Sequence, residues 1–172
     1  VGDGVTPHPC RTERLPLVGA PGFSERLFTQ VAQNYVVPHR PGAIDTRVAK
    51  HLAQSYGVRA FEVTRIAEEQ ALGQRLARGF PELEAEVVYA VRHEFCCTVE
   101  DFLARRTRLA FKDTKAARDA LPRVVALMGR ELRWGWWQRR RQLARGTKML
   151  EEFSSGKGDV KKSTSTREEN AK

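Results

Sequence analysis

The sequence lacks the features that mark several large classes of protein. It has three cysteines, Cys10, Cys96 and Cys97, without a C-x-x-C pair. We therefore expect no disulfide framework, and reduced thiols as in an intracellular protein. Glycine (13) and proline (8) are too few among 172 residues for a fibrous or low-complexity chain. No apolar run approaches about 18 residues, the length needed for a membrane-spanning helix.

Catalytic and nucleotide-binding motifs are also missing. The sequence contains no G-x-G-x-x-G after a predicted strand, no G-x-x-x-x-G-K-[ST], no H-E-x-x-H and no G-x-S-x-G. The histidines are widely scattered, without the spacing of metal ligands, and no calcium loop is present. We therefore predict no catalytic, cofactor-binding or metal-ligating residue in this segment.

The composition present is that of one basic globular domain. About 41% of the residues are hydrophobic, which is enough for a single core. Lys and Arg number 30 against 21 Asp and Glu, and the net charge of +9 favours an anionic partner. The chain starts at Val1 rather than Met. We therefore expect a fragment or a processed product, with any targeting signal outside it.

The pattern along the chain predicts an all-α fold with two irregular ends. Residues 1–22 are rich in Gly and Pro and are predicted to be an extended linker. Residues 23–153 carry apolar residues at helical spacing, and no alternating β-pattern persists, so we expect a compact bundle of six or seven helices. Residues 154–172 are rich in Ser, Lys and Glu and are predicted to be a disordered tail.

Local capping signals place several helix boundaries. Asp113 is a predicted N-cap, Asp45 or a residue just before it is predicted to open an earlier helix, and Gly57 is a predicted C-cap. Thr98 with Asp101 three residues later predicts a capping box at the start of a helix that carries Phe102, Leu103, Leu109 and Phe111. A last helix is predicted from Trp136 to about Phe153, with Trp136, Leu143 and Leu150 spaced by seven.

The basic charge is concentrated in the last third of the domain. Residues 105–148 hold fourteen Lys or Arg against three Asp or Glu, together with three tryptophans. Exposed tryptophan beside arginine suits an anionic membrane surface, and would also suit nucleic acid; lipid is favoured because no nucleic-acid motif is present. The alternative is a solvated basic face with the rings packed in the core. The candidate contact residues are Arg133, Trp134, Trp136, Trp137, Arg139, Arg140 and Arg141.

Three further groups could carry chemistry, but each has a simpler interpretation. Arg105 can pair with Asp101 at i+4, and the run 105–108 is more simply an exposed charge cluster than a guanidinium fork for phosphate or carboxylate. Acids near a helix start, such as those at 84, 86 and 94, are usually structural rather than acid–base catalysts. Cys96 and Cys97 fit core residues better than a redox pair.

Two longer runs resemble a known family. Residues 85–94 resemble the stretch A-E-V-x-Y-A-V-R-x-E, and residues 98–111 resemble T-x-x-D-x-L-x-R-R-T-R-L-A-F, of the FAD-dependent, mitochondrial-type glycerol-3-phosphate dehydrogenases. Both stretches belong to that family's C-terminal helical domain, and the similarity extends over residues 10–153. The motif residues that could make interdomain contacts are Glu86, Tyr89, Arg92, Glu94, Asp101, Arg105, Arg106, Thr107 and Arg108.

The resemblance implies a role within a larger enzyme. Members of the family oxidise glycerol 3-phosphate to dihydroxyacetone phosphate on FAD and pass the electrons to ubiquinone, at the mitochondrial inner membrane in eukaryotes. The flavin and substrate domains lie upstream, so this segment is expected to cover or brace them. The Arg-Arg-Thr-Arg motif is expected to contact the flavin domain. The alternative is a free-standing basic helical module that binds an anionic membrane or nucleic acid.

Overall fold

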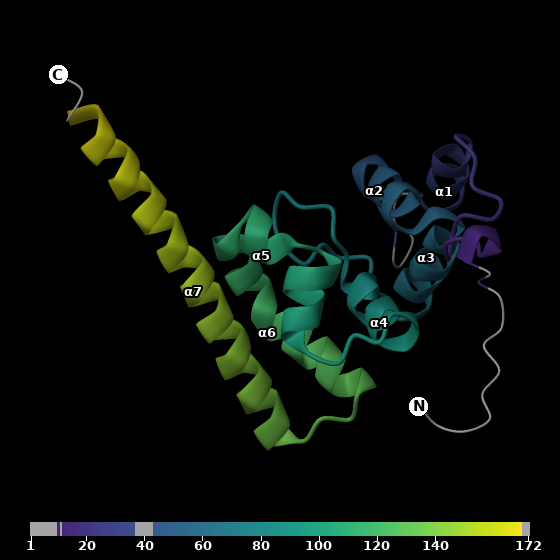
Figure 1. Cartoon of the computed structure of the whole chain (residues 1–172). Coiled ribbons are helices and arrows are strands. Elements are labelled where there is room, and N and C mark those ends of the chain that lie inside the picture. Colours follow the sequence, from purple (N-terminus) through teal and green to yellow (C-terminus); the bar gives the residue numbers. More distant parts are fainter. Residues whose placement is uncertain (1–9, 11, 37–42, 170–172) are drawn as a thin grey trace, which may run out of the picture.

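The protein is all-α in the part that the structure, a computed structural model, describes: residue 10, residues 12–36 and residues 43–169, with side chains as far as Ser155. That part contains seven α-helices and no strand beyond one isolated bridge between Arg75 and Leu83, as the sequence predicts (Figure 1). The elements are η1 (Thr12–Arg14), α1 (Leu27–Tyr35), α2 (Thr46–Tyr56), η2 (Gly57–Arg59), α3 (Ala60–Glu69), α4 (Glu84–His93), η3 (Asp101–Arg106), α5 (Leu109–Lys112), α6 (Thr114–Glu131) and α7 (Trp136–Glu169). The linker predicted over 1–22 lies partly outside the described residues.

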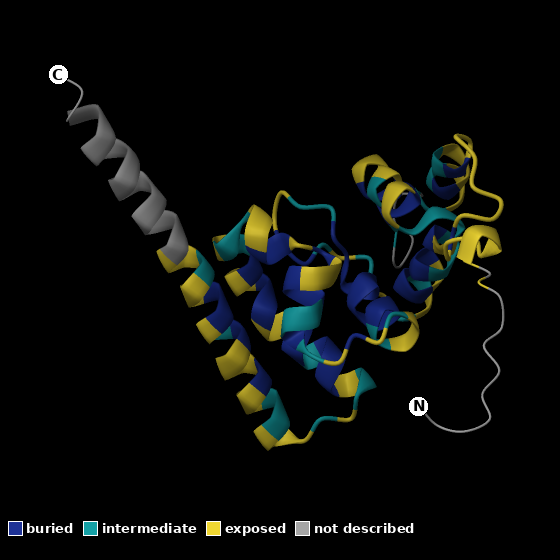
Figure 2. Ribbon diagram, viewed as in Figure 1, coloured by how far each residue is buried: buried dark blue, intermediate teal, exposed yellow. Residues whose placement is uncertain are grey.

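The helices follow one another across the molecule. Helices α1, α2 and α3 form one end, α4 packs between α3 and α6, and α7 lies along α6 and α5 at the other end (Figure 1). The buried residues form one continuous core through these layers (Figure 2). The first seven residues of α4, 84–90, are all buried, including the acidic residues Glu84 and Glu86.

The capping predictions are confirmed where the signals are local. The Asp45 carboxylate accepts from the Val48 N–H at 3.0 Å, and Asp113 accepts from the N–H groups of Lys115 and Ala116. The Thr98–Asp101 pair forms a reciprocal box, in which Asp101 accepts from the Thr98 N–H at 2.9 Å and its own N–H donates to the Thr98 hydroxyl. These bonds satisfy amide groups that have no partner within their own helix.

The segment after Thr98 differs from the single helix predicted there. Residues Asp101–Arg106 form a π-helical turn, in which the Thr107 N–H donates to the Phe102 carbonyl five residues earlier. Arg108 then adopts a left-handed backbone (φ 57°), and α5 begins at Leu109. The tight break keeps Phe102, Leu103 and Leu109 all buried.

Helix α7 packs on α6 through residues that only partly follow the spacing by seven. The buried positions are Gln142, Gly146, Met149 and Leu150, whereas Leu143 and Trp136 are exposed. The two helices approach closely at Gly146, where an added Cβ would lie 2.6 Å from Leu121 Cδ1. Of the three residues spaced by seven, only Leu150 is buried.

Helix α7 begins at Trp136, as predicted, and is assigned as far as Glu169. Its side chains are described only as far as Ser155. The polar tail predicted over 154–172 lies almost entirely beyond that point, and its disorder stays a prediction.

Candidate functional site

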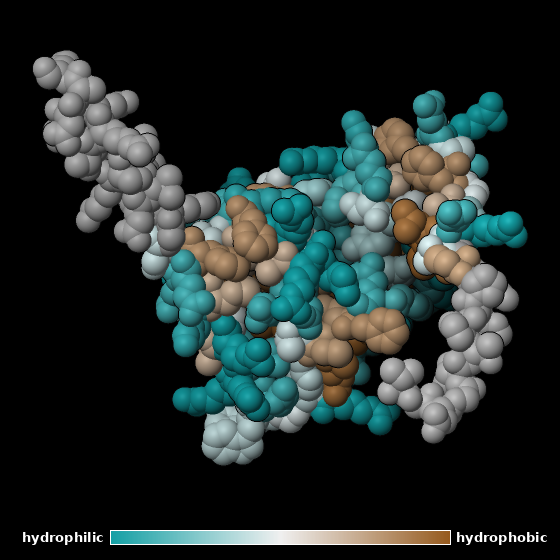
Figure 3. Space-filling view, viewed as in Figure 1, coloured by the Kyte–Doolittle hydropathy of each residue, from teal (hydrophilic) through white to brown (hydrophobic). Residues whose placement is uncertain are grey.

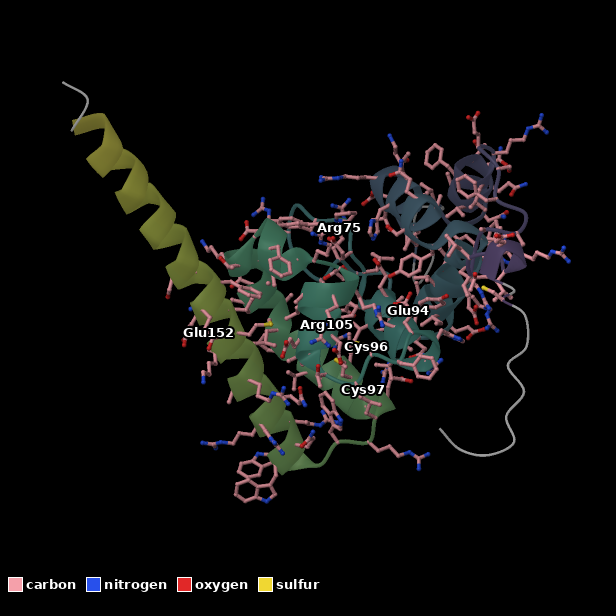
Figure 4. The ribbon with its side chains drawn as sticks, viewed as in Figure 1. Arg75, Glu94, Cys96, Cys97, Arg105 and Glu152 are labelled. Atoms are coloured by element: carbon pink, nitrogen blue, oxygen red, sulfur yellow. The ribbon has the colours of Figure 1, made fainter. Side chains whose placement is uncertain are left out.

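The two family-like runs form one region, where the end of α4 meets η3. Glu94, Cys96, Cys97 and Arg105 lie together there in Figure 4. Arg106 joins the two runs: its guanidinium donates to the Glu94 carbonyl at 2.6 Å and lies 3.5 Å from the Glu94 carboxylate. The motif therefore holds the loop between α4 and η3 in place.

Glu86 is the centre of a buried polar network that links α4 to α2. One carboxylate oxygen accepts from the Tyr56 hydroxyl at 2.8 Å and lies 3.0 Å from His51 Nε2, while the other accepts from the Leu83 N–H at 2.6 Å. Burial, together with Glu86, raises the pKa of Tyr56 well above its usual value. Both oxygens of Glu86 are thus occupied by the fold, so the residue is structural rather than an acid–base catalyst.

The network predicts a pH dependence of stability. Burial of His51 disfavours its charged form, but the hydrogen bond to Glu86 and the charge of that carboxylate outweigh burial and raise the pKa of His51. A histidine with a raised folded-state pKa stabilises the fold fully below its ordinary pKa, about 6.5, and this contribution is lost as pH rises through the raised value. We expect urea unfolding to show this loss, and His51→Gln to remove it; an unchanged pH profile in His51→Gln would contradict the assignment.

The other acids at the start of α4 are also paired. Glu82 accepts from Lys112 of α5 at 2.6 Å, and Glu84 accepts both prongs of the Arg123 guanidinium of α6 at 2.7 Å. The sequence interpretation of these acids as structural is therefore correct for Glu84 and Glu86. Sequence reasoning missed the partners of Glu82, Glu84 and Glu86, because residues thirty or more positions apart leave no local spacing signal. These partners are Lys112, Arg123 and His51 in turn.

Of the remaining motif residues, Tyr89 is buried and the others lie on or near the surface of this region. Tyr89 is buried with its ring edge-on to Tyr56, at 5.2 Å between centroids. Arg92 binds Glu131 at the end of α6 at 2.8 Å. Burial raises the pKa of Glu94, against the opposing charge of Arg106. Arg105 pairs with Asp101 at 2.5 Å, as the i+4 spacing predicts.

The motif ends in one inward and one outward side chain. The Thr107 hydroxyl is buried and donates to the Phe102 carbonyl at 3.1 Å. The next residue, Arg108, is exposed. The run 105–108 therefore presents three arginines outward around a threonine that packs inside.

A cleft of about 270 Å³ lies beside these arginines. It is lined by residues of α2, α4, η3 and α5, among them His51, Glu86, Arg105, Arg106 and Lys112. Both signs of charge line this cleft, and several of the charged groups already pair with each other, so a built anion site is not defined here. No group of His, Cys, Asp or Glu suited to hold a metal ion occurs among the residues that the structure describes.

The cysteines show no redox pairing within the described residues. All three thiols are free, and burial raises the pKa of Cys96 to about 12 while Cys97 is exposed. A thiol with so high a pKa is a poor nucleophile at neutral pH. Cys96 therefore acts as a core residue, whereas the assignment of Cys97 to the core is wrong, because Cys97 is exposed.

The basic, tryptophan-bearing residues divide into two groups. Trp136 and Trp137 are exposed, their rings meet edge to face at 4.3 Å, and Arg140 stacks over Trp136 at 5.6 Å. Arg133, Arg140 and Arg141 are exposed as well. Trp134 instead packs against the core, and Arg139 donates to its carbonyl at 3.1 Å. Within the described part, no helix is long and apolar enough to cross a membrane.

The geometry defines a class of protein before any comparison. The acids of the motif are committed to the packing of the domain, whereas arginines and apolar side chains face outward. The described part is therefore an all-α domain that presents arginines and apolar side chains on its surface. The chain belongs to the family described as the C-terminal domain of alpha-glycerophosphate oxidase, whose model matches residues 10–139.

Curated relatives agree with this family. The mitochondrial glycerol-3-phosphate dehydrogenase SDP6 of Arabidopsis thaliana is 45% identical over 155 residues, covering 86% of this chain and 25% of the relative. The mitochondrial glycerol-3-phosphate dehydrogenase of Homo sapiens is 42% identical over 147 residues, covering 83% and 19%. The probable mitochondrial enzyme of Dictyostelium discoideum is 36% identical over 153 residues, covering 89% and 23%. No solved structure matches the chain.

Proposed function

We propose that this chain is the non-catalytic C-terminal helical domain of an FAD-dependent glycerol-3-phosphate dehydrogenase. The proposal rests on the family match over residues 10–139 and on relatives of which the chain spans only 19–25% in length. The whole enzyme oxidises glycerol 3-phosphate to dihydroxyacetone phosphate and passes the electrons to ubiquinone. The names of the relatives support a mitochondrial location, and we propose the inner membrane, with peripheral attachment.

The described residues do not themselves fit a flavin site. Flavin dinucleotides bind where a glycine-rich turn joins a strand to a helix, and the described part has no such strand. The acids at the start of α4 are already occupied by Lys112, Arg123 and His51. We therefore assign FAD and substrate to the rest of the polypeptide. The role of this domain is to cover and brace that part.

The arginines of the motif are the proposed bracing contact, and Arg106→Ala tests them. Because the Arg106–Glu94 pair is solvent-accessible, we expect the variant to change the unfolding free energy of this chain by less than about 1 kcal/mol. In the full-length enzyme we expect at least a roughly tenfold loss of glycerol 3-phosphate oxidation, since a guanidinium would be removed from an interface. Arg118→Ala, at an exposed position of α6, is the matched control. Wild-type activity in Arg106→Ala would exclude bracing by this residue.

The exposed tryptophans support a second contact, with an anionic membrane surface. Trp136 and Trp137 project next to exposed arginines, an arrangement that combines apolar insertion with charge attraction. We expect the double variant Trp136→Ala/Trp137→Ala to bind phosphatidylglycerol vesicles about tenfold more weakly than wild type, in a salt-sensitive manner. Phe111→Ala, which removes another exposed aromatic ring, serves as control. Equal binding by the double variant, or stronger binding to duplex DNA than to vesicles, would overturn this contact.

A further inference from the structure

Phe95 is exposed in a way that its own domain does not explain. Its side chain is 91% exposed, and its backbone is left-handed, with φ at 53°. Glycine or asparagine is the usual residue at such a position after a helix, because a side chain on Cβ crowds the backbone there. An aromatic ring at this site thus carries both a backbone cost and the cost of apolar surface in water.

The loop around Phe95 holds this conformation firmly. The Cys96 N–H donates to the Ala90 carbonyl at 3.2 Å, and Arg106 donates to the Glu94 carbonyl at 2.6 Å. On the far side, the Cys97 N–H donates to Asp101 at 3.2 Å. The ring is therefore displayed by a fixed loop. A strained residue that its surroundings hold in place is characteristic of a contact site.

A second apolar segment lies close to Phe95. Residues 12–20, called here the incoming segment, expose Leu15, Leu17 and Val18, the last two by 81% and 80%. Val18 and Phe95 line one cleft of about 340 Å³, together with Tyr56 and Tyr89. Figure 3 shows apolar patches set among hydrophilic side chains on one face of the molecule.

The incoming segment is fixed to the domain by two glycines. Gly19 and Gly57 both have positive φ, and the Val58 N–H donates to the Gly19 carbonyl at 3.0 Å. A Cβ on either glycine would clash with the backbone of the opposite segment. Val18 therefore keeps a set position in the cleft that Phe95 also lines, and Leu17 is its exposed neighbour in the chain.

We propose that Phe95, Leu17 and Val18 form the apolar anchor on which the upstream, flavin-bearing part of the same polypeptide docks. This inference rests on the proposed function. The upstream part is the proposed occupant because the matched stretch is only 19–25% of the relatives' length and the family is described as a C-terminal domain. The incoming segment therefore leads from that part to this face. Arg59, Glu94 and Arg106 surround the cleft, giving the apolar centre and polar rim typical of protein interfaces.

Photocrosslinking in the full-length protein tests the anchor. Residue 95 is replaced by the photoreactive phenylalanine analogue p-benzoylphenylalanine, and the crosslinked peptides are identified by mass spectrometry. We expect a crosslink to a peptide upstream of this chain, within a polypeptide of unchanged mass. The same analogue at position 111, whose native ring stacks on Phe153, should give no upstream crosslink. A crosslink that joins two polypeptides or captures lipid, or no crosslink at position 95, would overturn the proposal.

A second variant avoids any dependence on the bulky analogue. Phe95→Gly relieves the backbone strain, so loss of folding is not expected from it. In the full-length protein we expect Cys97 to react slowly with a maleimide, because the upstream part docked on the anchor covers it. In Phe95→Gly we expect the reaction to be at least about tenfold faster, because that part no longer docks firmly. Fast labelling in wild type would contradict the proposal.

Flavin content and glycerol 3-phosphate oxidation are measured on the same preparations. A flavin-loaded, active enzyme with freely labelled Cys97 would overturn the anchor alone. A full-length protein without flavin or oxidation would overturn the proposed function itself.

Discussion

Replacing Glu86 with alanine is expected to lower the free energy of unfolding by about 3–5 kcal/mol. The variant leaves the Tyr56 hydroxyl, His51 and the Leu83 N–H without their shared partner, inside a region where the Glu86 side chain is only 1% exposed. Buried polar groups that lose a partner bear the full cost of having left water. Urea unfolding followed by circular dichroism measures the change.

Glu69→Ala is the matched control for this prediction. Glu69 is an exposed acid that lies 3.7 Å from Arg65 within α3, and pairs of this kind contribute less than about 1 kcal/mol. Glu86→Gln keeps an acceptor oxygen and should fall between the two variants. A loss in Glu86→Ala no larger than in Glu69→Ala would show that the network does not stabilise the α2–α4 contact.

Gly57→Ala is expected to cost about 3 kcal/mol, through backbone strain combined with a clash. Gly57 has φ 56° and ψ −137°, a conformation nearly restricted to glycine, and its added Cβ would meet the Gly19 carbonyl. The incoming segment should detach as a result. Urea unfolding measures the energy, and limited proteolysis within residues 12–20 measures the detachment.

Two other glycines distinguish the cost of backbone strain from the cost of the steric clash. Gly79 also has a positive φ, 86°, but an added Cβ would meet nothing within 4 Å, so Gly79→Ala should cost only about 1–2 kcal/mol. Gly135 has neither feature and should tolerate alanine. Equal losses at Gly57 and Gly79 would mean that the contact with Gly19 contributes nothing.

Local chemistry made part of the fold predictable. Asp45, Asp113 and the Thr98–Asp101 pair cap helices as expected, because each acts on amide groups within three residues of itself. The Arg105–Asp101 pair was likewise predictable from its i+4 spacing. The all-α class followed from helical periodicity over most of the chain.

Contacts between distant segments were not predictable. Glu84 binds Arg123 and Glu82 binds Lys112, partners that are 39 and 30 positions away in the sequence, and nothing in their local spacing marks these pairs. The close packing of Gly146 of α7 against Leu121 of α6 shows the same limit. Arg108 gave no signal of its left-handed backbone, because arginine carries no preference for it.

The candidate interface was only partly visible in the sequence. The motif residues Glu94, Asp101, Arg105 and Arg106 were selected as possible interdomain contacts, and the structure pairs Glu94 with Arg106 and Asp101 with Arg105. The display of Phe95 was not predicted, because exposure depends on the loop that Arg106 and Asp101 hold. A phenylalanine next to two cysteines would, on composition alone, be assigned to the core.

The most direct test of the account concerns the native protein, isolated with an antibody against this segment. Its intact mass and its visible absorbance are recorded together. We predict a polypeptide several times longer than this chain, with bound flavin, as expected for a C-terminal domain that spans 19–25% of its relatives. A flavin-free protein of about 19.5 kDa, the mass of this chain alone, would contradict the account and favour a free-standing binding module.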